Sequence, residues 1–293
     1  MKALKQANLN NVVFLDIETV RIQDTIEAGT PLMDSWEYKM RYSREAADKF
    51  EEDLVQAYKD KAALYAEFAK IVCITIGKVQ NGVLKLKSYY NHDEKALLTE
   101  FTDVLNGLVA ANPKIQLCGH AIKGFDIPFI MRRCLVNRVD IPDLIDVADV
   151  KPWLMTALDT LELWKGTGFY SASLINIAVA LGLPSPKQDM QGSETSSVYY
   201  TEGDAGLKRI TTYCEQDVIT LTNIVRILRG EDVVDSVEVA TESAEKVPVL
   251  TKIFNTKKVS KKELVGIENT VSEMADDTEK SIAKEILSVT LPK

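Results

Sequence analysis

Residues 12–19, Val-Val-Phe-Leu-Asp-Ile-Glu-Thr (VVFLDIET), decide the expected fold. The apolar, β-prone run at 12–15 predicts a central strand that is buried on both faces. Asp16 and Glu18 follow this run two residues apart, so the pleat of the strand places both carboxylates on one face. Two such acids repel each other unless a cation neutralises them, and Mg²⁺ and Mn²⁺ prefer oxygen ligands. Taken alone, the pair is equally compatible with a strand end at the surface, where both acids are solvated.

The chain that follows predicts a mixed α/β fold. Between 21 and 70, apolar residues recur every three to four positions among charged ones, a spacing that predicts a helical insertion after the first strand. Residues 71–78 and 83–90 predict two strands, which the turn residues Asn81-Gly82 join as a hairpin. A further short, buried strand is expected at 115–118.

Helices dominate the expected second half of the chain. A short helix is predicted at 173–181, and a longer one at 204–229 with Asp204 as its N-cap and Gly230 as its stop. Beyond residue 232 the composition shifts to Val, Glu, Lys, Ser and Thr. A weak helical period there predicts a small helical extension over 232–293.

Composition bounds the class of protein. The 293 residues include 35 basic and 43 acidic side chains, for a net charge of −8. This charge argues against a polybasic nucleic-acid binder, because phosphate neutralisation needs clustered Lys and Arg, but it leaves room for a local basic groove. No apolar run is long enough to span a membrane and residues 1–11 lack the apolar core of a signal peptide, so the expected compartment is the cytoplasm. Reduced, buried thiols, rather than disulfides or a zinc site, are expected at the four cysteines, Cys73, Cys118, Cys134 and Cys214.

Three more residues stand out as candidates for chemistry. Asp126 follows the strand at 115–118, so in a mostly parallel sheet it emerges at the same carboxyl edge as Asp16. Its alternative role is to start the helix before Pro128. Tyr213 and Asp217 lie one turn apart on the long helix and share a face, although a surface pair explains them better in isolation.

The combination of these motifs resembles a known family. The sequences LDIET, GHAIKGFDIPF and YCEQD occur in the order of the three motifs of the DEDD superfamily of 3′-5′ exonucleases. The tyrosine four residues before the last aspartate matches the DEDDy branch, and Thr212 stands where the other branch has histidine. Within the superfamily, the chain is most similar to the stand-alone predicted exonucleases related to the proofreading domain of family B DNA polymerases. The resemblance covers about residues 10–230, which we take as the exonuclease domain.

The resemblance implies a fold and an activity. The fold is an RNase H-like mixed sheet of five or so strands flanked by helices, with the second strand antiparallel. The activity is metal-dependent removal of nucleotides from the 3′ end of single-stranded or frayed DNA, by a mechanism with two Mg²⁺ or Mn²⁺ ions. Asp16 would bridge the ions, Glu18 and Asp217 would complete the water-activating one, and Asp126 would serve the other. Tyr213 would orient the attacking water, because a phenol is a poor base at neutral pH.

Substrate contacts are also implied. The backbone groups of Ile17 and Thr19 would cradle the terminal nucleotide, Phe125 would stack on a base unless it belongs to the core, and Lys187 would contact a phosphate. His120 is a candidate on the substrate side, although a loop hydrogen bond suits it better. The family usually has Asn after this histidine, whereas this chain has Ala121, which affects substrate grip more than metal binding. A phosphate-tracking wall is expected from five basic residues, Lys114, Lys123, Arg132, Arg133 and Arg138.

The sequence is also compatible with two other functions. An RNA 3′-end exonuclease of the ribonuclease D type would use the same chemistry. A binding protein on a degenerate nuclease fold would use the insertion or the extension as a partner surface. Asp159 fits an N-cap better than a fifth catalytic acid. Core or domain contacts are expected for the three tryptophans, Trp36, Trp153 and Trp164.

Nucleic-acid binding should depend on metal, because four clustered carboxylates repel phosphate until divalent cations offset them. We expect weak binding of a labelled single strand in EDTA at physiological salt and tighter binding with Mg²⁺ or Mn²⁺, measured by fluorescence anisotropy. Strong binding by the metal-free protein would contradict this expectation.

Overall fold

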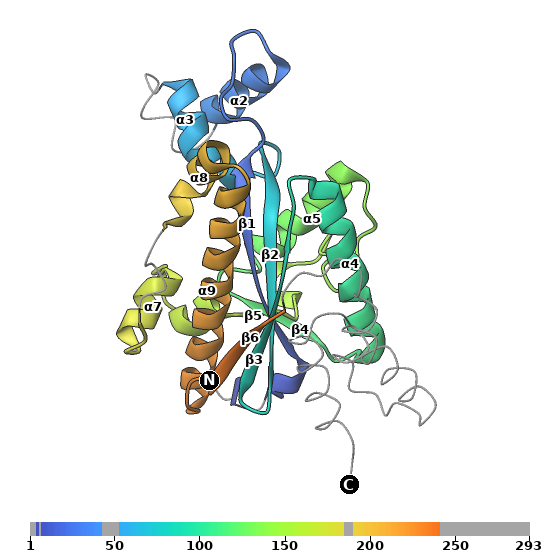
Figure 1. Cartoon of the computed structure of the whole chain (residues 1–293), viewed down its shortest axis with the longest axis vertical. Coiled ribbons are helices and arrows are strands. Elements are labelled where there is room, and N and C mark those ends of the chain that lie inside the picture. The colour runs from blue at the N-terminus through green and yellow to red at the C-terminus, as the bar shows by residue number, and fades with distance from the viewer. Residues whose placement is uncertain (1–3, 6, 43–52, 185–189, 241–293) are drawn as a thin grey trace. The chain divides into compact units, whose positions relative to one another are not determined.

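The computed structural model describes residues 4–5, 7–42, 53–184 and 190–240. Within these ranges a six-stranded mixed sheet carries helices on both faces, in agreement with the expected RNase H-like α/β fold (Figure 1). The strands are β1 (Val12–Arg21), β2 (Ala69–Gln80), β3 (Val83–Tyr90), β4 (Gln116–Gly119), β5 (Leu158–Asp159) and β6 (Ser236–Val239). The helices are α2 (Pro31–Arg41), α3 (Leu54–Lys61), α4 (Glu94–Ala111), α5 (Asp126–Asn137), α6 (Thr160–Lys165), α7 (Leu174–Ala180), α8 (Thr195–Glu202) and α9 (Asp204–Arg229).

The strand order brings three parallel strands to one edge of the sheet. The order is β5-β4-β1-β2-β3-β6, and both β4 and β5 run parallel to β1. β2 pairs antiparallel with β1, which confirms the expected antiparallel second strand. Because β4 and β5 both end level with Leu15 of β1, the segments that follow them emerge beside the second half of β1, which carries Asp16 and Glu18, and ligand sites of open α/β sheets form at such strand ends.

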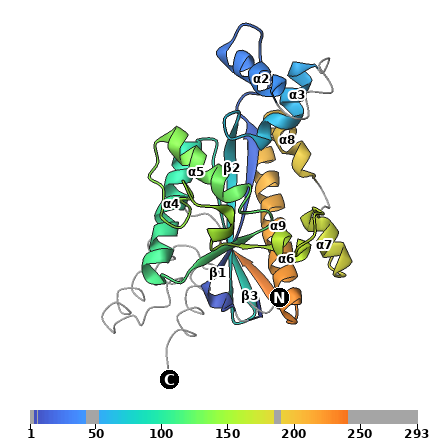
Figure 2. The same ribbon diagram turned by 180° about the vertical axis from the view of Figure 1, so that it is seen from behind.

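β1 forms the centre of the core. Nine of its ten residues are buried, because α9 covers one face of the sheet and α5 lies on the other (Figures 1 and 2). On the α9 side, Phe14 packs with Val218, and Val20 packs with Ile210. The close approach of α9 requires Gly77 of β2, where an added Cβ would lie 2.8 Å from Cγ1 of Val218. Asp16 and Glu18 therefore interrupt an apolar stripe that faces α9.

The structure confirms the predicted hairpin and the predicted long helix. Asn81 and Gly82 adopt φ values of 51° and 84°, the left-handed pair that a two-residue hairpin turn needs. α9 ends at Gly230, whose φ of 83° is typical of a helix C-cap. Asp204 is the first residue of α9 rather than its N-cap, which is Gly203.

The segment between β1 and β2 is helical, as predicted. α2 and α3 enclose Trp36, which is fully buried and donates from Nε1 to the carbonyl of Leu54 at 3.0 Å. Its ring meets those of Tyr58 and Phe68 edge to face. The hydroxyl of Thr19 ties this segment to β1 through a 2.7 Å bond to the Ala63 carbonyl.

The other two tryptophans are not core residues. Trp153 is 74 % exposed and Trp164 is 41 % exposed, so the expectation of burial is wrong for both. Trp153 lies in η3 (Pro152–Leu154) and Trp164 lies in α6. Each helix has only one or two turns, which is too short for the spacing of apolar residues to define a buried face.

The start of the expected C-terminal extension is a strand rather than a helix. β6 at 236–239 pairs in parallel with β3, and the N–H of Asp235 donates to the carbonyl of Gly82. The remainder of the predicted extension, 241–293, lies outside the described residues. The described residues up to 102 and from 116 to 240 form one compact unit, and Asp103–Ile115 is assigned to another. No helix in the described ranges is long and apolar enough to cross a membrane.

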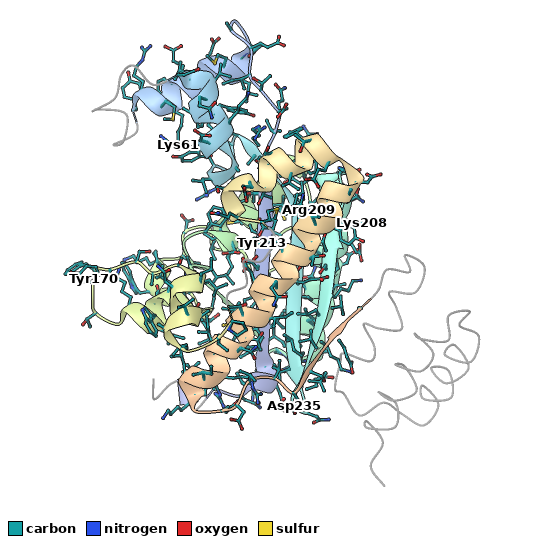
Figure 3. The ribbon with its side chains drawn as sticks, turned by 60° about the vertical axis from the view of Figure 1, so that its left-hand side comes forward. Lys61, Tyr170, Lys208, Arg209, Tyr213 and Asp235 are labelled. Carbon is teal, nitrogen blue, oxygen red and sulfur yellow. The ribbon has the colours of Figure 1, made fainter. Side chains whose placement is uncertain are left out.

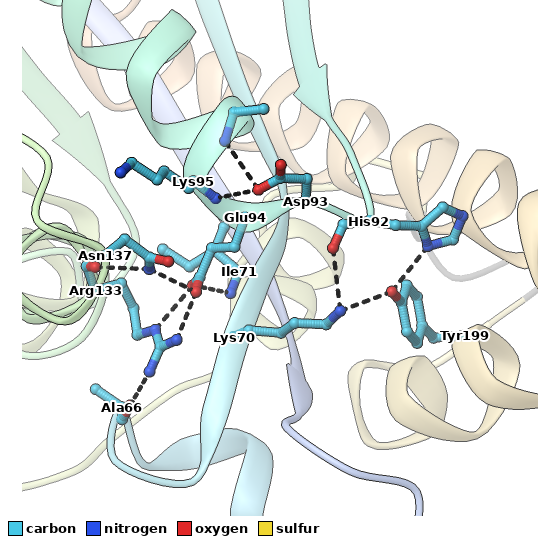
Figure 4. Close-up of polar contacts among 11 residues, drawn as sticks. Ala66, Lys70, Ile71, His92, Asp93, Glu94, Lys95, Arg133, Asn137 and Tyr199 are labelled. Carbon is cyan, nitrogen blue, oxygen red and sulfur yellow. Dashed lines mark hydrogen bonds and ion pairs between the residues drawn. The ribbon is translucent and has the colours of Figure 1, made fainter.

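A buried ion pair joins α4 to α5. Arg133 donates from Nε to Glu94 Oε1 at 2.8 Å and from Nη1 to the carbonyl of Ala66 at 2.8 Å (Figure 4). Glu94 also accepts from the N–H of Ile71 and from the side chain of Asn137, each at 2.7 Å. The two charged side chains are only 4 % and 6 % exposed, so this network fixes α5, and with it Asp126, against the sheet.

Removing Arg133 should destabilise the protein strongly, because it leaves the carboxylate of Glu94 buried without its cation. We expect Arg133→Ala to lower the free energy of unfolding by about 3–5 kcal/mol in urea titrations. The matched control is Arg41→Ala, which breaks the exposed pair with Glu37 and should cost about 1 kcal/mol or less. Equal losses in the two variants would contradict this account of α5.

Candidate functional site

β1 and α9 together hold one acidic cluster. Asp16 and Glu18 face α9, and the thiol of Cys214 donates to Asp16 Oδ2 at 3.4 Å. Ligand atoms of these three residues all lie within 4.8 Å of one another. Cys214 and Asp217 are three residues apart on α9 and share a face, so the same helix face brings Asp217 to the cluster.

Glu18 is the more deeply buried acid of β1. Its side chain lies opposite Cys73 of β2 and is 7 % exposed with its backbone. The hydroxyl of Thr195, at the start of α8, donates to Glu18 Oε2 at 3.2 Å. α8 therefore orients this carboxylate through the hydroxyl of Thr195.

Asp126 joins the cluster from α5. It is the first residue of that helix and is 4 % exposed. Its carboxylate accepts hydrogen bonds from its own N–H and from the N–H of Ile17, the residue between the two acids of β1. The second motif is thus attached directly to the first, although 110 positions separate Asp16 from Asp126 in the sequence.

Electrostatics shows that the four carboxylates occupy one site. Burial raises the pKa of Asp16 well above its ordinary value, and the charges of Glu18, Asp126 and Asp217 raise it further. The pKa of Glu18 is raised by burial and then by Asp217. Burial also raises the pKa of Asp126 to about 7. Repulsion of this kind favours either protonation or a bound cation.

Tyr213 lies on α9 (Figure 3), and Asp217 follows it one helical turn later, so the two residues share a face. Its pKa is raised by burial and by the charges of Asp217, Glu18 and Asp16, with a hydrogen bond to Asp217 adding to the effect. The phenol therefore stays protonated at neutral pH. It is suited to orient a water molecule or an oxygen of a substrate, and not to remove a proton.

The loop before Asp126 is held by Asp159 and His120. Asp159 caps α6, as predicted, by accepting from the N–H of Leu161 at 2.9 Å, and it also accepts from the N–H groups of Ala121 and Lys123. His120 bonds through Nδ1 to the Thr160 hydroxyl and through Nε2 to the carbonyl of Ala172. Burial lowers the pKa of His120, so it is neutral at pH 7.

Ala121 occupies the position at which the related exonucleases usually have Asn. Its φ is 58°, in the left-handed region where Asn is tolerated and Ala is disfavoured. The two backbone bonds to Asp159 from residues 121 and 123 hold this conformation in place. The departure from the family pattern therefore leaves the loop intact.

The residues expected to contact the substrate differ in how exposed they are. Ile17 is buried, and the hydroxyl of Thr19 is bonded within the protein, so only backbone groups of β1 are left for a nucleotide. Phe125 is partly buried, with its ring centroid 5.2 Å from that of Phe129. Arg132 is exposed on α5. Lys187 lies outside the described residues.

The predicted basic wall is wrong for two of its members. Arg133 is buried in its ion pair with Glu94, and Lys123 pairs with Glu162 at 2.7 Å. Both partners are distant in sequence, so counting charges between 112 and 138 missed them. The wall is therefore reduced, and Arg132 and Arg138 are its exposed members on α5 and at its C-cap.

Two functional neighbours were not predicted. Cys214 was expected only as a buried thiol, which it is, but its contact with Asp16 is also part of the site. Its position inside YCEQD, three residues before Asp217, was the available signal. Thr195 lies in a stretch without a recognisable motif, and nothing in the sequence marked it.

Comparison with models of protein families identifies a family that matches this chain. The sequence model of a family of predicted 3′-5′ exonucleases related to the exonuclease domain of PolB matches residues 61–264. This range holds Asp126, Tyr213 and Asp217, whereas Asp16 and Glu18 precede it and reach the site through the pairing of β1 with β2. No curated protein matches the chain.

The burial of Asp126, with the nearby charge of Asp159, should be measurable as a pH-dependent instability of the metal-free protein. The folded-state pKa of Asp126, about 7, exceeds its ordinary value of 3.8, so the folded protein holds an extra proton between these limits and loses stability as pH rises through them. Asp126→Asn removes this loss. In EDTA at pH 8 we expect the variant to be more stable by roughly 2–4 kcal/mol, with little difference at pH 3.

Urea unfolding at both pH values checks this expectation. The control is Asp143→Asn, at an exposed acid outside the cluster, which should change stability little at either pH. An Asp126→Asn variant that is less stable than the parent at pH 8 would contradict the raised pKa of Asp126.

Proposed function

Because the chain belongs to the family of predicted 3′-5′ exonucleases related to the exonuclease domain of PolB, we propose that it removes nucleotides from the 3′ end of single-stranded or frayed DNA. The observation that carries the proposal is the meeting of four mutually repelling carboxylates and one protonated tyrosine, which come from β1, α5 and α9. An acidic cluster of this kind needs cations, and a phosphodiester substrate needs them too.

Two divalent cations, Mg²⁺ or Mn²⁺, are the proposed cofactors. The donor set fits them, because carboxylate oxygens are their preferred ligands. Asp16, Glu18 and Asp217 would hold one ion, and Asp126 would serve the second, with Asp16 shared between them. When bound, such ions generate a nucleophile from water at neutral pH and neutralise charge on the phosphoryl oxygens.

Cys214 has a different role from the carboxylates. Burial raises the pKa of its thiol well above the ordinary value, so the group keeps its proton at neutral pH. It donates to Oδ2 and to the carbonyl oxygen of Asp16, at 3.4 and 3.5 Å. The thiol thereby fixes the orientation of the carboxylate that is proposed to bridge the ions.

Tyr213 would position the attacking water by donating or accepting a hydrogen bond. Its protonated state is supported by the raised pKa, and its hydroxyl is oriented by the hydrogen bond to Asp217, one turn later on the same helix. On the leaving-group side, Asp126 is held by the N–H of Ile17, so the two acids of β1 and the acid of α5 keep a fixed relation.

Substrate binding is proposed at the carboxyl edge of the sheet. The backbone of β1 around Thr19, the partly exposed ring of Phe125 and the exposed guanidinium of Arg132 are the proposed contacts on the described chain. His120 would contribute by holding the loop before Asp126. Lys187 remains a proposed phosphate contact from the sequence alone.

Replacing ligands of the proposed site should abolish the activity. With Mg²⁺ or Mn²⁺, wild-type protein should shorten 5′-labelled single-stranded DNA from its 3′ end, and Asp16→Ala and Asp217→Ala should show no cleavage. Tyr213→Phe should lower kcat by roughly 10–100-fold, the effect typical of residues that orient metal-bound groups.

The matched control for these variants is Glu215→Gln. Glu215 lies on α9 between Tyr213 and Asp217, but it accepts from the hydroxyl of Ser88 and not from the cluster, so its variant should keep wild-type rates. A labelled RNA strand run beside the DNA distinguishes the two polymer classes. Wild-type rates in Asp16→Ala or Asp217→Ala would contradict the assignment of the site. Preferential shortening of RNA would contradict the choice of DNA as substrate.

A further inference from the structure

The loop between α6 and α7 exposes aromatic rings. Phe169 is 97 % exposed, Tyr170 is 89 % exposed, and Trp164 near the end of α6 is 41 % exposed. Figure 3 shows Tyr170 projecting outward from this part of the chain. We call residues 164–170 the aromatic loop. Rings at this level of exposure gain nothing from the core, so folding does not account for them.

The chain places the aromatic loop after the edge of the sheet that carries the acids. β5 runs parallel to β4, and β4 runs parallel to β1, so β4 and β5 both end level with Leu15 of β1, the residue before Asp16. Asp16 and Glu18 lie on β1, Asp126 follows β4, and α6 begins directly after β5. The chain that leads to the aromatic loop therefore leaves the sheet at the same strand ends as the segment that leads to Asp126.

Two hydrogen bonds hold the chain on either side of the aromatic loop against the segment that ends in Asp126. His120, which directly follows β4, bonds through Nε2 to the carbonyl of Ala172 and through Nδ1 to the hydroxyl of Thr160. The first bond holds Ala172, two residues after the aromatic loop, and the second holds Thr160 at the start of α6. Asp159 reinforces the connection by bonding residues 121, 123 and 161.

The composition of this part of the chain suits one kind of ligand. Residues 163–173 contain three aromatic residues and Lys165 but no acid, although the whole chain has a net charge of −8. Gly166 has a φ of 57° and open space where a Cβ would lie, so the backbone is accessible beside the rings. Exposed rings beside a cation are the usual platform for the bases and phosphates of a single strand. A duplex fits less well, because its base faces are already stacked.

We propose that Trp164, Phe169 and Tyr170 stack on bases of the single strand upstream of the 3′-terminal nucleotide, with Lys165 beside the backbone phosphates. This inference rests on the proposed function and adds a strand-binding subsite to it. The aromatic loop acts on substrate length and takes no part in the hydrolysis of the terminal phosphodiester.

Two substrates separate the aromatic loop from the chemistry. One is a long oligothymidylate, and the other is p-nitrophenyl thymidine 5′-phosphate, a chromogenic ester that has no upstream bases. The double variant Phe169→Ala/Tyr170→Ala should lower kcat/KM on the oligothymidylate roughly tenfold for each stacked base lost, and leave hydrolysis of the ester unchanged.

Matched variants test whether stacking is the cause. Phe169→Tyr/Tyr170→Phe keeps both rings and should keep wild-type kcat/KM, whereas Phe169→Leu/Tyr170→Leu keeps apolar surface without rings and should behave like the double alanine variant. The control is Trp153→Ala, which removes a ring that is 74 % exposed but precedes β5, and which should leave both substrates unaffected.

The possible results all decide the inference. An unchanged kcat/KM on the oligothymidylate, or equal losses on both substrates, would overturn the strand-binding subsite while leaving the proposed function in place. Full activity of the leucine variant would show that apolar contact, and not stacking, is involved, and would also overturn it. Wild-type protein that hydrolyses neither substrate would instead overturn the proposed function.

Discussion

Coulomb repulsion among carboxylates buried between a strand and a helix is the constraint on which the rest of the structure depends. Asp16 and Glu18 lie within an apolar stripe of β1, and α9 closes over them with Asp217. In a low-dielectric setting this arrangement is unfavourable unless protons or cations are present. The surrounding apolar contacts, such as Phe14 against Val218, keep the helix in place despite it.

The fold converts this constraint into a site by positioning each acid from a rigid element. The parallel strands bring the chain after β4 back to β1, and the N–H of Ile17 bonds Asp126 directly to that strand. Behind Asp126, the ion pair of Arg133 with Glu94 anchors α5. Thr195 and Cys214 then orient the acids of β1. Catalytic geometry needs this level of support, because small displacements of reacting groups are costly.

Local sequence signals predicted what local interactions determine. The buried run of β1, the Asn81-Gly82 turn and the end of α9 at Gly230 each depend on neighbouring residues. Features set by distant partners were missed or misread. From the sequence, Arg133 was predicted to be a surface charge, because its partner Glu94 lies 39 positions away. The contact of Cys214 with Asp16 spans 198 positions. β6 was missed because its only pairing is with β3, far away in the sequence.

The central claim is that these acids form one cation site that is electrostatically unfavourable when metal-free. The most direct measurement is calorimetric titration with Mn²⁺ near pH 6.5, in buffers of different ionisation enthalpy, which counts the protons released on binding. Because burial and mutual repulsion raise the pKa of Asp16, Glu18 and Asp126, the account predicts saturable binding with release of protons. Absence of binding, or binding without proton release, would contradict it.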